Sequence, residues 1–70
     1  MAESLKELRQ KRGLTVEALG VLGDIDGGTV SRIERGLVQP KRATVVKLAR
    51  GLGISAKRMK AILEGSSDAA

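Results

Sequence analysis

The apolar residues of this chain recur in short blocks whose members lie three or four positions apart, the spacing of one face of an α-helix. In the first block Leu5 and Leu8 lie three apart, and either Glu3 or Ser4 suits the start of a helix. Gly13 suits its end, because glycine readily adopts the left-handed conformation that often follows a helix. The pattern predicts a first helix over residues 3–11.

The same spacing predicts four further helices, each separated from the next by glycine, proline or another turn-forming residue. Their predicted ranges are Val16–Leu22, Gly27–Arg35, Arg42–Gly51 and Ala56–Glu64. Thr15, Asp26 and Ser55 are good N-cap residues for three of them. The apolar residues that these helices carry are Ala18, Leu19, Leu22, Val30, Ile33, Val45, Leu48, Ala49, Leu52, Met59, Ile62 and Leu63. No segment shows the two-residue alternation of a strand, so the predicted fold class is all-α.

The length and composition favour a single small domain. The chain has 70 residues, and we expect a domain over residues 1–64 followed by a disordered C-terminal tail over residues 65–70. Phe, Trp and Tyr are absent, so the core must consist of Leu, Ile, Val, Met and Ala. Such a core suits short packed helices rather than a large cavity, and we expect no small-molecule ligand.

The residue inventory argues against catalysis. Cys and His are absent, which removes disulfides, thiolate metal sites and the commonest general base. We therefore expect no enzymatic activity, no metal and no cofactor, and we interpret Asp24 and Asp26 as a turn residue and an N-cap. No apolar run has the length of a signal peptide or a membrane span. A cytoplasmic, nucleoid-associated location without membrane binding is expected.

Positive charge is concentrated in one part of the chain. The formal net charge is +5, and residues 35–60 contain eight Lys and Arg residues but no Asp or Glu. A one-sided positive field attracts polyanions, although a solvated basic surface is the alternative interpretation. The absence of aromatic side chains disfavours single-stranded RNA, whose bases stack on such side chains. Double-stranded DNA is therefore the favoured partner.

The second and third predicted helices, together with the turn between them, indicate a function. The second helix is too short to be stable alone, and a glycine-containing turn joins it to the third. This arrangement suits a helix-turn-helix, whose second helix lies in the major groove of DNA. Thr29, Arg32 and Gly28 fall on one side of the third helix, and Val30 and Ile33 on the other.

Several sequence blocks also resemble the helix-turn-helix domains of phage repressors and Cro proteins, the Xre-like group. They are LKELRQKRGLTVEALG, TVSRIERG and TVVKLARGLGIS, which extend over about residues 5–63. The resemblance implies a compact five-helix, lambda-repressor-like DNA-binding domain that acts as a homodimer on a two-fold site. With no effector domain, such a protein regulates transcription by occupying its operator, as a small repressor does.

Four departures from the family pattern stand out. Val16 occupies a position that is often a polar phosphate-contacting residue, and Gly20 replaces the alanine that usually follows Leu19. Asp24 stands where the turn glycine is expected, and aspartate tolerates the left-handed conformation. The first two exposed positions of the third helix, where relatives carry long base-reading side chains, are here Gly27 and Gly28.

These glycines shift the expected reading of bases to other residues. Arg32 is the principal candidate, since an arginine fork can bind guanine O6 and N7; Thr29 is the second candidate, Ser31 a weaker one, and Gly28 leaves room for DNA. On this hypothesis Arg32→Ala abolishes the sequence preference, whereas Gly28→Ala mainly stabilises the helix. The expected phosphate contacts are Thr15, Val16, Arg35, Lys41 and Arg42. Lys57, Arg58 and Lys60 are either a solvated face or a second basic surface.

Two further expectations concern contacts between and within protein chains. The resemblance implies that Arg9 in the first helix pairs with Glu34 at the end of the third. Apolar residues near the C-terminal ends of the third and fifth helices are candidates for the dimer interface, namely Leu37, Val38, Ile62 and Leu63. The alternative is a monomeric protein-interaction module, like an antitoxin or adaptor, that uses the same residues to bind another protein.

Overall fold

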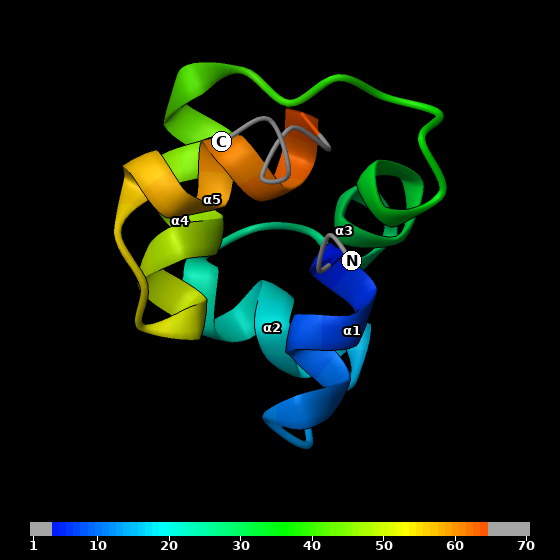
Figure 1. Cartoon of the computed structure of the whole chain (residues 1–70). Helices are drawn as coiled ribbons and strands as arrows, with labels where there is room; N and C mark the ends of the chain where they lie inside the picture. The colour runs from blue at the N-terminus through cyan, green and yellow to red at the C-terminus, as the bar shows by residue number, and fades with distance from the viewer. Residues whose placement is uncertain (1–3, 65–70) are drawn as a thin grey trace.

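The computed structural model describes residues 4–64, and these form the all-α, five-helix arrangement expected from the sequence (Figure 1). The helices are α1 (Leu5–Lys11), α2 (Val16–Gly23), α3 (Gly27–Glu34), α4 (Arg42–Leu52) and α5 (Ala56–Glu64). The expected disordered tail over residues 65–70 lies outside the described residues. Within residues 4–64, no helix combines the length and the apolar character needed to cross a bilayer.

Side-chain caps explain where the helices begin. The Ser4 hydroxyl accepts a hydrogen bond from the Glu7 amide, and the Glu7 carboxylate accepts one from the Ser4 amide. Ser4 therefore has extended backbone angles, and α1 begins at Leu5 rather than at the expected residue 3. Thr15 and Asp26 cap α2 and α3 as predicted. The Ser55 hydroxyl likewise accepts a hydrogen bond from the Arg58 amide in the first turn of α5.

The core lies where the five helices meet, and all ten of its buried apolar residues are aliphatic or Met. They are Leu5, Leu8, Leu19, Val30, Ile33, Leu48, Ala49, Leu52, Met59 and Ile62. Leu22, which the sequence placed among the apolar residues of its helix, is 54% exposed, and its neighbour Val21 is 82% exposed. The buried side of α2 consists of Leu19, Gly20 and Gly23. Leu22 lies only three residues after Leu19, but no neighbouring element covers it.

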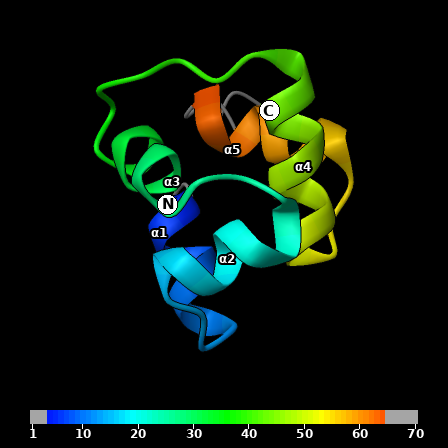
Figure 2. The ribbon, with the colours of Figure 1, turned by 180° about the vertical axis from the view of Figure 1, so that it is seen from behind.

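Glycines allow α2 to lie close to its two neighbours. A Cβ on Gly20 would collide with the backbone oxygen of Ile25, which explains why this position is smaller than the usual alanine. A Cβ on Gly23 would lie 2.7 Å from the Lys47 oxygen in α4. The end of α2 therefore packs directly on α4, and the connection to α3 starts there (Figure 2). This close packing fixes the direction in which the chain leaves α2.

The turn between α2 and α3 depends on one left-handed residue. Asp24 has φ 59° and ψ 48°, as expected for the residue that replaces the turn glycine. The chain then turns back, and the Ile25 amide donates a hydrogen bond of 2.7 Å to the Gly20 oxygen. Ile25 packs against the core directly before the Asp26 cap of α3. The turn thus sets both the position and the starting point of α3.

Candidate nucleic-acid interface

Helix α3 carries a buried side and an exposed side. Val30 is fully buried and Ile33 is 6% exposed, so both anchor the helix in the core. On the other side Gly28 and Arg32 are exposed, whereas Thr29 and Ser31 are partly buried. Four expected base-reading residues therefore lie on one short helix, and Arg32 is the long side chain among them. This exposed side is the candidate surface for nucleic acid.

The two glycines at the start of α3 have different surroundings. Gly27 is partly buried against the first turn of α2, and a Cβ there would lie 3.4 Å from the Glu17 Cα. The expectation that Gly27 is an exposed position equivalent to Gly28 was therefore wrong, because the start of α3 lies against α2. Gly28, by contrast, is exposed. Of the two, only Gly28 leaves a gap on the outer surface of α3.

The gap at Gly28 is bordered by charged groups. A Cβ built on Gly28 would lie 2.8 Å from the Asp26 Oδ2, and 3.6 and 3.9 Å from the terminal nitrogens of Arg32. An alanine there would have to displace the carboxylate that accepts the Thr29 amide at 3.3 Å. The expected stabilisation by Gly28→Ala is thus opposed by a disturbed N-cap. Spacing along the chain does not indicate that Asp26 borders the same space as Arg32.

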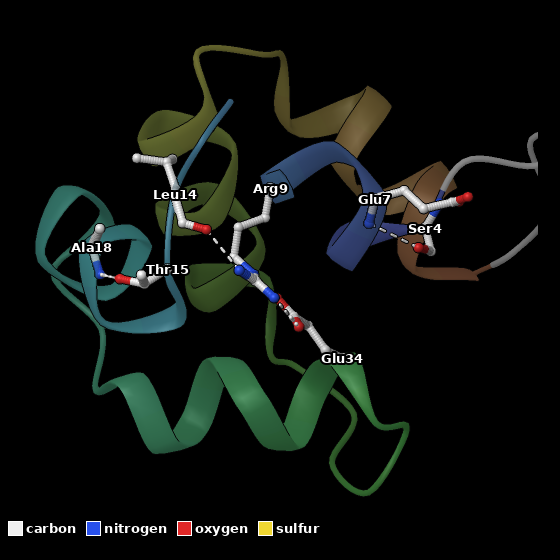
Figure 3. Close-up of polar contacts among 7 residues, drawn as sticks. All are labelled: Ser4, Glu7, Arg9, Leu14, Thr15, Ala18 and Glu34. Atoms are coloured by element: carbon white, nitrogen blue, oxygen red, sulfur yellow. Dashed lines mark hydrogen bonds and ion pairs between the residues drawn. The ribbon is translucent and has the colours of Figure 1, made fainter. Parts of the chain in front are cut away.

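A buried ion pair holds the C-terminal end of α3 against α1. The Arg9 Nε donates to the Glu34 Oε2 at 2.6 Å, and Nη2 donates to Oε1 at 3.1 Å (Figure 3). Nη1 donates to the Leu14 backbone oxygen at 2.6 Å. The two side chains are only 10% and 6% exposed. The pair implied by the resemblance is therefore present, and it links α1, the turn before α2 and α3.

The electrostatics of this pair follow from its geometry. The hydrogen bonds to Glu34 raise the pKa of the Arg9 guanidinium, burial lowers it, and the negative charges of Glu34 and Glu17 raise it again. The net direction is upward, so Arg9 keeps its charge. A charged guanidinium in a buried position requires its carboxylate partner, and this requirement fixes the orientation of α3.

The expected phosphate-binding residues lie at two helix N-termini and at the end of α3. The Thr15 hydroxyl accepts a hydrogen bond from the Ala18 amide at 3.0 Å, and the Val16 side chain is partly buried against the core. Lys41, Arg42 and Arg35 are all exposed. Lys41 makes no side-chain cap and the first turn of α4 has no acid. The start of α4 therefore combines open backbone amides with positive charge.

A groove between the loop after α3, α4 and α5 contains three of the five large apolar side chains that are exposed in residues 4–64, namely Leu37, Val38 and Val46. Its volume is about 990 Å³, and Leu37, Val38, Val46 and Leu63 line it. Leu37 is 63% exposed, Val38 40% and Val46 37%. Val46 was not among the expected interface residues, although it directly follows an inward-facing valine. We refer to this surface as the α4–α5 groove.

Ile62 must be removed from the expected interface residues. Its side chain is only 7% exposed and belongs to the core, together with the fully buried Met59. The neighbouring Leu63 is partly buried and lines the α4–α5 groove. Lys57 and Lys60 also line this groove, whereas Arg58 is not among its lining residues. The three basic residues of α5 therefore do not form a single surface.

Comparisons with known proteins agree with this arrangement. The model of the helix-turn-helix domain family matches residues 1–62. The chain is 42% identical over 60 residues to the uncharacterized HTH-type transcriptional regulator RghRB of Bacillus subtilis (strain 168). The match covers 84% of this chain but 43% of that relative, so the chain spans less than half of the relative's length. No solved structure gives a significant match.

Proposed function

Because the chain belongs to the helix-turn-helix domain family, we propose that it is a sequence-specific, double-stranded-DNA-binding transcriptional regulator. The observation that carries the proposal is α3, whose exposed side presents Arg32 next to the space over Gly28. The name of its RghRB relative, a transcriptional regulator, supports the same function. The proposal places this chain on DNA in the cytoplasm, as a member of the Cro and Xre-like group.

In the proposed complex α3 lies in the major groove. The fork of Arg32 binds guanine, while Thr29 and Ser31 contact neighbouring base edges. The basic residues at the end of α3 and at the start of α4, together with the backbone at the start of α2, bind phosphates on either side of the groove. Because Gly28 has no side chain, the helix backbone approaches the DNA closely, and the shape of the groove contributes to selection.

We propose further that two copies bind together and repress transcription by occupying the operator. The α4–α5 groove is the proposed contact, and a second copy is its occupant. Its apolar side chains Leu37 and Val38 are exposed in a single copy. The groove also carries both signs of charge, so in a two-fold contact Lys60 of one copy can meet Glu64 of the other.

The test of DNA binding is selection of bound sequences from random double-stranded DNA at a stated salt concentration. A two-fold motif with half-sites about one helical turn apart is expected. Binding to the selected site should weaken steeply as salt rises, because phosphate contacts release counterions. Absence of any enriched sequence would refute DNA reading and favour the protein-interaction module.

The dimer is tested separately by sedimentation at micromolar concentration, with and without the selected site. Leu37→Glu should yield a monomer that binds a half-site, whereas Val21→Glu is the matched control. Val21 is 82% exposed but lies on α2, outside the α4–α5 groove. A wild-type protein that remains monomeric on the two-fold site would refute the proposed contact.

A further inference from the structure

Opposite charges are separated along this chain. Residues 13–31 contain three acidic residues and no Lys or Arg, whereas residues 35–60 contain eight basic residues and no acid. The first segment includes the whole of α2, and the second includes α4 and the start of α5. A protein with a formal net charge of +5 therefore presents one helix whose only charge is negative.

The outer side of α2 is a ridge of exposed acidic and apolar side chains. Glu17, Val21 and Asp24 follow one another at intervals of four and three positions, so they lie on one side of the helix and its C-cap. All three are exposed, and Val21 is 82% exposed. Leu22 beside them is 54% exposed. We refer to these four residues as the α2 ridge.

The α4–α5 groove has the opposite shape and the opposite charge. It is a hollow of about 990 Å³ whose lining includes three exposed apolar side chains. Its charged lining residues are three cations and one acid, namely Arg42, Lys57, Lys60 and Glu64. Two positive charges of the groove are therefore not balanced by an acid among the lining residues.

The α2 ridge complements this groove in both respects. The ridge carries two acids, which equals the excess of positive charge in the groove. The ridge and the groove together contain all five large apolar side chains that are exposed in residues 4–64, so a contact between them would cover every one. The side of a helix in an apolar groove is a common mode of recognition, and opposite charge selects the partner. A second copy of the chain supplies both surfaces.

We propose that copies of this chain associate head to tail, with the α2 ridge of one copy in the α4–α5 groove of the next. The two surfaces differ, so the copies at each end keep a free ridge or a free groove, and the contact extends into a linear assembly. It requires no DNA and goes beyond the proposed function. Because the two-fold pair uses the same groove, linear assembly lowers the concentration of pairs that can occupy an operator.

The first test is sedimentation of the wild-type protein without DNA, at concentrations up to millimolar. At about 0.01 M salt the average mass should rise with concentration beyond that of two copies. At about 1 M salt it should approach the mass of the two-fold pair, because the Debye length shrinks from roughly 30 Å to roughly 3 Å and the attraction between ridge and groove is screened. A mass that never exceeds two copies at low salt would overturn the proposal.

Reversed charges identify the two surfaces. Glu17→Lys alters the ridge, and Lys57→Glu with Lys60→Glu alters the groove. Each variant alone should raise the dissociation constant of the head-to-tail contact by roughly tenfold or more, since like charges then face each other. An equal mixture should recover the linear assembly, because each ridge finds a groove of opposite charge on the other variant. A contact between two grooves predicts no such recovery, since Glu17 lies outside the groove.

Two further variants control for net charge and for folding. Lys6→Glu reverses an exposed cation on α1, outside the groove, and should leave the assembly unchanged. Glu17 contributes to the raised pKa of Arg9, so the Tm of Glu17→Lys is measured first. Val21→Arg is the second ridge variant, and its highly exposed position should leave the Tm unchanged while the assembly is lost.

The outcomes are separate from those for DNA binding, because no measurement here contains DNA. Loss of assembly in both ridge variants with recovery in the mixture would support the head-to-tail contact. Loss without recovery in the mixture would refute it, and so would an equal loss in Lys6→Glu. A protein that forms linear assemblies but enriches no DNA motif would refute the proposed function alone.

Discussion

Removal of the Glu34 carboxylate should destabilise the domain more than any change at its surface. In Glu34→Ala the Arg9 guanidinium loses both hydrogen bonds to the carboxylate and keeps only the one to the Leu14 oxygen. Because the two side chains are 10% and 6% exposed, water cannot readily replace the lost partner. Breaking a buried pair from one side costs about 3–5 kcal/mol.

This loss is large relative to the whole stability of the domain. A chain of 70 residues is expected to have a free energy of unfolding of roughly 4–10 kcal/mol. A change of about 3 kcal/mol should lower the Tm by about 12 °C or more in a domain of this size. The assay is thermal and urea unfolding followed by circular dichroism, with Gln10→Ala as the control for truncation of an exposed side chain on α1.

A double variant tests whether an unpaired Arg9 charge causes the predicted loss of stability in Glu34→Ala. Replacement of both partners, as Arg9→Met with Glu34→Leu, removes the uncompensated charge and should recover much of the stability lost in Glu34→Ala. If Glu34→Ala melts within about 3 °C of the wild-type protein, the pair is not the constraint that fixes α3. If the double variant is as unstable as the single one, lost packing rather than an unpaired charge explains the effect.

Three other substitutions test individual contacts, each by its Tm and free energy of unfolding. Gly20→Ala should destabilise the domain by about 1–3 kcal/mol despite the higher helix propensity of alanine, because the alanine Cβ would collide with the Ile25 backbone oxygen. An unchanged Tm would contradict this close packing. Gly28→Ala should change the free energy of unfolding by less than about 1 kcal/mol, because the gain in helix propensity is offset by displacement of the Asp26 carboxylate from the Thr29 amide. A clear stabilisation would show that this carboxylate can move without loss of the cap. Thr15→Ala should cost about 1 kcal/mol through loss of its bond to the α2 amide, and no loss would mean that water replaces the cap.

The local features of this chain could be predicted from sequence because they depend on near neighbours. Helix ranges follow from the spacing of Leu, Ile and Val, and the caps Thr15 and Asp26 act within three residues of their own position. The left-handed turn residue Asp24 was likewise predictable, since its role depends on the residue type that the turn tolerates. The Arg9–Glu34 pair is the exception, because the resemblance rather than spacing implied it.

Burial at the edges of helices could not be predicted, because it depends on which neighbour covers a given side. Leu22 and Ile62 are both apolar residues in amphipathic helices, yet one is 54% exposed and the other 7%. The difference arises because α4 packs on the side of α2 that carries Leu19 and Gly23 and leaves Leu22 uncovered, whereas Ile62 lies in the core beside Met59. No pattern within α2 or α5 alone contains this information.

The order of residues is enough to predict the five helices, the caps Thr15, Asp26 and Ser55, and the acid-free basic region from residue 35 to residue 60, because each depends on local chemistry or on composition. Packing between helices determines that Gly27 lies against α2 while Gly28 is exposed, and that Asp26 and Arg32 border the space over Gly28. This arrangement arises because α2 covers one side of the first turn of α3. The exposure of each residue in the first turn of α3 therefore depends on the contact with α2 and not on the order of residues along the chain.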